Sequence, residues 1–151
     1  MFLARRFSGS LIRTLVIRFM VGVVFTSEGL QKLLYPAELG SGRFAKIGIP
    51  FSDIVGPAVG GVEMLCGMLI LAGCFTRYAV LPLLLIMFVA LLLTKLPVLL
   101  GHEMLGTSLK ELPRYGLLSM LHEARTDICM VCGLINLWIK ETADGGLRQG
   151  K

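Results

Sequence analysis

The chain has 151 residues, of which 55% are hydrophobic and 17% are charged, and its formal net charge is +5. Several long apolar runs are spread along the sequence, which is typical of an integral membrane protein and argues against a soluble globular domain. The fifteen Lys and Arg residues are scattered and form no dense basic patch. The composition therefore favours a membrane surface, and not nucleic acid, as the partner of the positive charge.

A first membrane-spanning helix is predicted over about residues 11–34, and it is the least apolar of the predicted spans. Arg18, Glu28 and Lys32 fall on one side of a helical wheel, and Glu28 precedes Lys32 by four residues, the favourable order for an intrahelical ion pair. Because this run contains charges and lacks a small-residue cleavage site, we expect a retained helix and not a signal peptide. The helix should present one polar stripe inward.

A second span is predicted over about residues 54–75, after a connector at 35–53 that is rich in Gly and Pro. It carries one carboxylate, Glu63, near its middle. At 100° per residue, one narrow sector of this helix collects Gly56, Gly60, Glu63, Gly67, Ile70 and Cys74. Small residues let helices approach closely in membranes, so this face should meet protein. Glu63 is then either part of a functional site or a partner in an ion pair that only holds helices together.

Two further spans are predicted over about residues 78–100 and 120–139. The short link between the second and third spans predicts an antiparallel helical hairpin. The third span has Pro82 near its start, where a missing N–H costs little, and Lys95 near its end. A long loop at about 101–120 should either lie on the membrane surface or cap the bundle, and a polar tail is expected at 140–151.

The expected fold is therefore all-α, a single domain forming a four-helix transmembrane bundle with its two longer loops on one side. We expect a multi-pass membrane protein. The basic residues flanking the first span favour an orientation with both termini in the cytoplasm.

Charged residues on all four predicted spans fall at similar depths when helix offsets are converted at about 1.5 Å per residue. They form an expected polar cluster of Glu28, Lys32, Glu63, Lys95, Arg125 and Asp127. Arg18 lies deeper and could reach Glu63 only by extending its side chain. In apolar surroundings such groups must pair or become neutral, which suits them to carry protons or to bind a small polar head group.

The cysteines and histidines have ordinary interpretations. Cys129 and Cys132 have the spacing of a redox motif but lie in an apolar helix without support for a thiolate, so we expect buried small hydrophobes. A disulfide between the second and fourth spans stays open. His102 and His122 are each followed by Glu but do not form a HExxH motif, so no metal or haem is indicated.

Several strings resemble the DoxX family of small four-helix bacterial membrane proteins. They are EGLQKLLYP, GRFAKIGIPF, VGGVEMLCGMLILAGCFTR, IMFVALLLTKLP and HEARTD. The resemblance covers about residues 12–139 and is most specific around Glu63. The resemblance implies a location in the bacterial inner (cytoplasmic) membrane. Some members of the family are subunits of thiosulfate:quinone oxidoreductase or belong to membrane complexes that manage thiol and oxidative stress.

The leading functional hypothesis is a membrane subunit of a quinone-linked oxidoreductase complex. Quinone reduction takes up protons where water is scarce, so Glu63, Glu28, Asp127 and Lys95 are the candidate proton-exchanging residues. Arg18, Lys32 and Arg125 are candidates for holding the quinone. The expected partners are membrane lipid and either other subunits of the complex or further copies of this chain.

The alternative is a noncatalytic structural or assembly subunit of a larger respiratory or redox complex, in which the charges only fix the bundle. Solute or ion transport ranks third, because the sequence lacks the inverted repeats and broken helices typical of transporters.

Overall fold

The computed structural model describes residues 2–103 and 110–149, and describes side chains at 11–103 and 110–143. Every regular element in these residues is an α-helix, which confirms the all-α expectation. The elements in chain order are α1 (Phe2–Leu34), α2 (Ser41–Ile47), α3 (Ser52–Ala72), α4 (Thr76–Thr94), α5 (Leu96–Leu100) and α6 (Leu117–Gln149).

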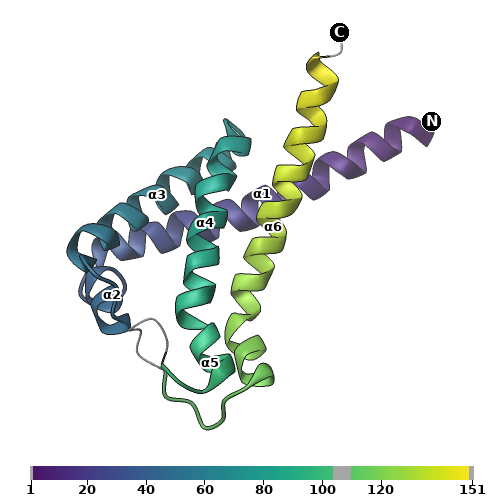
Figure 1. Cartoon of the computed structure of the whole chain (residues 1–151). Helices are drawn as coiled ribbons and strands as arrows, with labels where there is room; N and C mark the ends of the chain where they lie inside the picture. Colours follow the sequence, from purple (N-terminus) through teal and green to yellow (C-terminus); the bar gives the residue numbers. More distant parts are fainter. Residues whose placement is uncertain (1, 104–109, 150–151) are drawn as a thin grey trace.

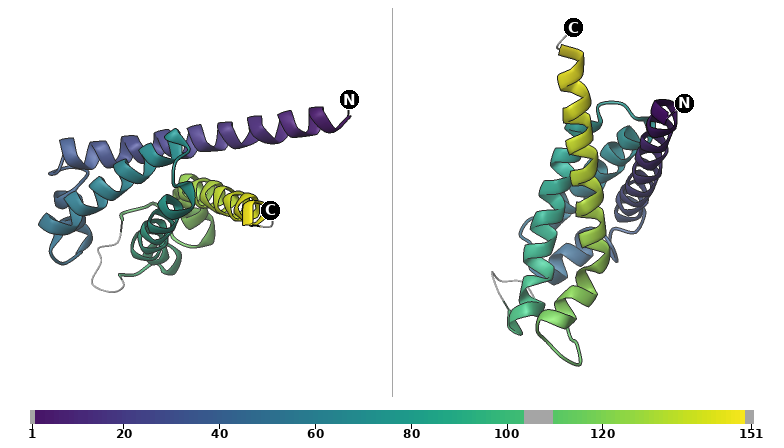
Figure 2. Two further views of the ribbon diagram at one scale, coloured as in Figure 1. Left: turned by 90° about the horizontal axis from the view of Figure 1, so that it is seen from above. Right: turned by 90° about the vertical axis from the view of Figure 1, so that its right-hand side faces the viewer.

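The long helices are arranged as two pairs that cross each other. Figure 1 shows α1 running beside α3, and α4 running beside α6. The two views of Figure 2 show the same pairs, with the N- and C-terminal ends of α1 and α6 projecting beyond the crossing. The core lies where the pairs meet and includes fully buried Val21, Ile70, Leu83 and Leu134, one from each long helix. Apolar burial at this crossing joins the two pairs.

Two stretches of the described chain are long and apolar enough to cross a membrane. They are Ser52–Ala72, with a mean hydropathy of 1.9, and Thr76–Leu100, with a mean hydropathy of 2.6. Large aliphatic and aromatic side chains are exposed along these helices, Phe88 and Leu85 among them. A surface of this kind is typical of helices that contact lipid.

The turn between α3 and α4 agrees with the predicted hairpin. Gly73 has φ +72°, a conformation that glycine adopts without strain, and its N–H donates to the Ile70 carbonyl at 3.1 Å. The next N–H, of Cys74, donates to the Leu69 carbonyl at 3.0 Å, so the freed carbonyls at the end of α3 are satisfied. Phe75 follows with φ 51°, and α4 begins directly after it.

The helices differ from the predicted spans in three places. α1 begins at Phe2 and not near residue 11, and α6 continues from Leu117 to Gln149 through much of the stretch expected as a polar tail. The third span divides at Lys95 into α4 and α5, because Pro97 has no N–H to continue the helical hydrogen bonds. α6 is thus a 33-residue helix, the same length as α1.

Candidate functional site

The site is built on a close glycine contact between α1 and α3. A Cβ atom placed on Gly29 of α1 would lie 2.4 Å from the Gly60 carbonyl oxygen and 2.4 Å from the Met64 backbone nitrogen, both on α3. Further along the same contact, a Cβ on Gly67 would lie 2.6 Å from the Thr26 backbone nitrogen. The absence of side chains at these positions therefore lets the two backbones touch.

The glycine face predicted for the second span is the buried face of α3. The buried residues of this helix are Gly56, Gly60, Glu63, Cys66, Gly67 and Ile70. The inclusion of Cys74 in that face was wrong, because Cys74 is exposed. The helix ends at Ala72, and the left-handed Gly73 turns the chain before the periodicity can carry Cys74 inward.

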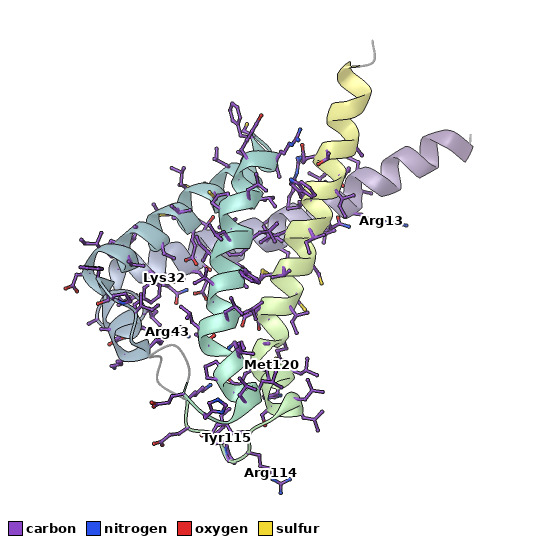
Figure 3. All side chains as sticks on the ribbon, viewed as in Figure 1. Arg13, Lys32, Arg43, Arg114, Tyr115 and Met120 are labelled. Carbon is purple, nitrogen blue, oxygen red and sulfur yellow. The ribbon has the colours of Figure 1, made fainter. Side chains whose placement is uncertain are left out.

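Glu63, Lys32 and Glu28 form a charged triplet beside the glycine contact. The Lys32 Nζ lies 2.5 Å from Oε2 of Glu63 and 3.4 Å from Oε2 of Glu28, which confirms the predicted intrahelical pair of α1. The Glu63 side chain is only 6% exposed, whereas that of Glu28 is 53% exposed. Figure 3 labels Lys32 on the part of α1 that lies near α2 and α3. The triplet thus leads from the interior to the surface.

The burial of this triplet fixes its electrostatics. A carboxylate removed from water must be compensated, and Lys32 supplies a direct charge-assisted hydrogen bond to Glu63. With two carboxylates sharing one ammonium group, the triplet carries a net charge of −1 when all three groups are ionised. It can therefore take up one proton without creating excess positive charge in the interior.

Lys95 and Asp127 form a second, separate pair. The Lys95 Nζ lies 3.4 Å from Oδ2 of Asp127, and this pair joins the break between α4 and α5 to α6. Among the described residues, no ion pair links either group to Glu63 or Lys32. The six residues expected in one cluster are therefore distributed over two pairs of helices.

The two arginines proposed to hold a ligand have other partners. Arg125 Nη1 lies 2.8 Å from Nε2 of His122 and donates to the His122 carbonyl at 2.9 Å, on the exposed side of α6. Arg18 pairs with Glu141, and its Nη1 lies 2.8 Å from the position of a Cβ on Gly73. Arg18 therefore stabilises α1 against α6 beside the α3–α4 turn, and it does not bond to Glu63.

Glu141 is the partner that sequence reasoning missed. It lay in the stretch expected as a polar tail, and only the continuation of α6 brings it opposite Arg18. The neighbouring Lys140 donates to Thr14 of α1, so two polar contacts join these helices at the same level. Residues 137 and 141 are separated by one helical turn, so they lie on the same face of α6, and this spacing could have indicated the contact.

The four cysteines are free thiols. Cys66 is buried in α3, but Cys74, Cys129 and Cys132 are exposed. The expectation that Cys129 and Cys132 are buried was wrong, because α6 turns Met130, Leu134 and Leu137 toward the core and places these cysteines on its outer side.

A cavity of about 330 Å³ lies at the loop end of α6, distinct from the triplet. Its lining consists of Leu112, Pro113, Arg114, Leu118, Ser119, His122 and Glu123. Figure 3 shows Arg114 and Tyr115 on the loop that borders it. Glu123 pairs with Lys110 at 2.5 Å, so the acidic group of the cavity wall is neutralised.

Comparisons with known proteins identify the family of the chain. The sequence profile of the DoxX family matches residues 13–96, which include α3, the glycine contact and the charged triplet. The chain belongs to the DoxX family. An uncharacterized membrane protein of Mycobacterium tuberculosis (strain ATCC 25618 / H37Rv) is 47% identical over 121 residues, covering 80% of this chain and 70% of the relative. No solved structure matches the chain.

Membership of the DoxX family confirms the resemblance noted in the sequence. Together with the two helical stretches that are long and apolar enough to cross a membrane, this membership identifies the chain as a DoxX-family membrane protein. The profile match ends at residue 96, so α6 with Asp127 and Arg125 lies outside it. The M. tuberculosis relative shares enough length to indicate that the likeness is not confined to a single helix.

Proposed function

We propose that this chain is a four-helix membrane subunit of a quinone-linked oxidoreductase complex in the inner membrane, with both termini in the cytoplasm. Besides the two apolar stretches, α1 and α6 each have 33 residues and so extend for about 50 Å at 1.5 Å per residue. That length exceeds the roughly 30 Å of a bilayer core, which supports four spans.

The observation that carries the proposal is the Glu63–Lys32–Glu28 triplet. It combines a buried carboxylate, an ammonium group in contact with it, and a half-exposed carboxylate 3.4 Å further along. Groups in apolar surroundings that share one compensating charge are suited to general acid and base work. Glu63 is the inner proton-exchanging group and Glu28 the outer one, with Lys32 positioned to follow the proton by moving between them.

A quinone supplies the two-electron chemistry when it is bound, and the electrons come from a redox centre of a partner subunit. The residues of this chain fit such a group in one respect. Lys32 supplies a buried hydrogen-bond donor and Glu63 a buried acceptor, and both adjoin a helix surface that is otherwise apolar. Lys95 and Asp127 form a second exchange position, on the other pair of helices. We do not assign Arg18 and Arg125 to quinone binding, because each is bonded to another residue of this chain.

The test is Glu63→Gln assayed for quinone reduction in native membranes. We expect a loss of about 10²-fold, the lower end of what a positioned proton donor contributes. Glu123→Gln is the matched control, because it makes the same chemical change at a carboxylate paired with an exposed lysine. Normal quinone reduction by Glu63→Gln, with failure of the purified protein to bind added quinone, would refute the proposal.

A specific observation also favours the alternative, a noncatalytic structural subunit. The triplet lies directly beside the closest approach of α1 and α3, since a Cβ on Gly60 would lie 3.1 Å from Cβ of Lys32. An ion pair at that place can fix the register of two helices without any chemistry. In that case Glu63→Gln lowers the amount of assembled complex in native membranes, while each assembled complex keeps its full turnover.

A further inference from the structure

The cavity at the loop end of α6 lies beside the end of a stretch that is able to span the membrane. The N–H of Gly116, directly before α6, donates to the Val98 carbonyl at 3.1 Å and so holds the cavity loop against α5. The 25-residue stretch Thr76–Leu100, to which Val98 belongs, extends for about 37 Å at 1.5 Å per residue, against about 30 Å for a bilayer core. Its end, and the cavity with it, therefore reaches the level of the lipid head groups.

Two side chains of the cavity wall offer unused hydrogen-bond donors. Arg114 is exposed and forms no ion pair with the described residues, and Figure 3 shows its side chain at the loop end of the molecule. A guanidinium group cannot accept, so the contact of Arg125 with Nε2 of His122 at 2.8 Å requires that Nε2 accepts and that Nδ1 carries the proton of the neutral ring. This Nδ1–H has no acceptor among the described residues.

The charges around the cavity favour an anion. The carboxylate of Glu123 also lies in the wall, but the Lys110 ammonium group at 2.5 Å compensates it. Glu111 is exposed and does not line the cavity. The wall therefore keeps the positive charge of Arg114, together with the donor of His122. Phosphate oxygens accept from both of these groups, and a guanidinium fork matches their geometry.

The remaining wall is mainly apolar, which favours a lipid over a soluble phosphate. It consists of Leu112, Pro113 and Leu118, with Ser119 as a further polar residue. Leu118 is 83% exposed, and Leu121, nearly one turn further along α6, is 42% exposed. Apolar side chains thus continue from the cavity toward the middle of the bundle. A volume of about 330 Å³ is at the small end for ligand sites, so it suits a head group and leaves the acyl chains outside.

We propose that this cavity binds the head group of an anionic glycerophospholipid, such as phosphatidylglycerol. The phosphate accepts hydrogen bonds from Arg114 and from Nδ1 of His122, and the acyl chains follow Leu118 and Leu121 into the bilayer. The lipid then ties the loop end of the bundle to the membrane surface, where anionic lipids attract basic side chains.

The test uses the full-length protein, purified in detergent, with phosphatidylglycerol, phosphatidylcholine and soluble glycerol phosphate as probes. Native mass spectrometry follows the bound lipid through a titration and gives an apparent Kd for each. We expect phosphatidylglycerol to bind about tenfold more tightly than phosphatidylcholine, because the choline cation opposes Arg114. Glycerol phosphate at the same concentration should not displace phosphatidylglycerol, because it lacks the acyl chains.

The role of the arginine is tested in the same titration. Arg114→Gln should lower the affinity for phosphatidylglycerol about tenfold, the effect of one hydrogen bond to a charged group. His122→Phe keeps a planar ring but removes the donor, so it should also weaken binding. Arg43→Gln is the matched control, because Arg43 is an exposed arginine of α2 outside the cavity, and it should leave the affinity unchanged. Equal affinities for the two lipids, equal effects of Arg114→Gln and Arg43→Gln, or full displacement by glycerol phosphate would each overturn the proposal.

Discussion

The glycine contact between α1 and α3 leads to a sharp prediction for Gly29→Ala. The added methyl carbon would lie 2.4 Å from a carbonyl oxygen and from a backbone nitrogen of α3, whereas an ordinary contact begins at 3.4 Å. The two helices must therefore separate by about 1 Å, the difference between these two distances. Neither obstructing atom belongs to a flexible side chain, so rotation cannot relieve the contact.

Overpacking of this kind costs about 1–3 kcal/mol of unfolding free energy, and backbone obstruction places Gly29→Ala near the upper end. Gly61→Ala is the matched control, because a Cβ on Gly61 meets no atom within 4 Å. Alanine is also the better helix former, so the control should be neutral or slightly stabilising. The measurement is unfolding in detergent micelles followed by the fluorescence of the single tryptophan, Trp138. Equal stability of the two variants would refute the close-contact account.

Two further predictions concern the second ion pair and the thiols. Lys95→Met should destabilise the protein by about 1–3 kcal/mol, because it leaves Asp127 partly buried without its cation. The control Lys110→Met removes an exposed ion pair and should cost only about 0–1 kcal/mol. Equal losses of stability for the two variants in thermal unfolding would contradict this prediction. Cys66 should resist a membrane-permeant maleimide in the folded protein while Cys129 reacts, as mass spectrometry of labelled peptides will show; rapid labelling of Cys66 would contradict its burial.

The buried face of α3 was predictable because it depends on one helix alone. The 3.6-residue period places the glycines and Glu63 in one sector, and in an apolar helix that sector has only protein to face. The Glu28–Lys32 pair was predictable for the same reason, since both residues lie one turn apart on α1. Local periodicity therefore predicted which residues belong to the triplet, but not the exact contacts between them.

The contacts of Arg18 and Arg125 could not be predicted from periodicity. They depend on how α6 crosses α1, and depth along a helix says nothing about the direction in which a side chain points. α6 turns Arg125 outward to His122 and extends far enough to bring Glu141 to Arg18. Its C-terminal part was predicted to be a polar tail because it contains few apolar residues.

The central claim is that the triplet exchanges protons and does not merely hold α1 against α3. The two roles separate in the double variant Lys32→Met, Glu63→Met. Replacing both partners of a buried ion pair by apolar residues of similar size is often neutral or stabilising, so the helix contact should survive. Gly29→Ala is the control that disturbs the contact of α1 with α3 without removing a charge.

The decisive measurement is the rate of quinone reduction by membranes containing this double variant, divided by the amount of assembled complex. The proton-exchange account predicts normal assembly with a rate about 10²-fold below that of the unaltered protein. An unaltered rate per assembled complex would contradict it and leave the triplet a structural role.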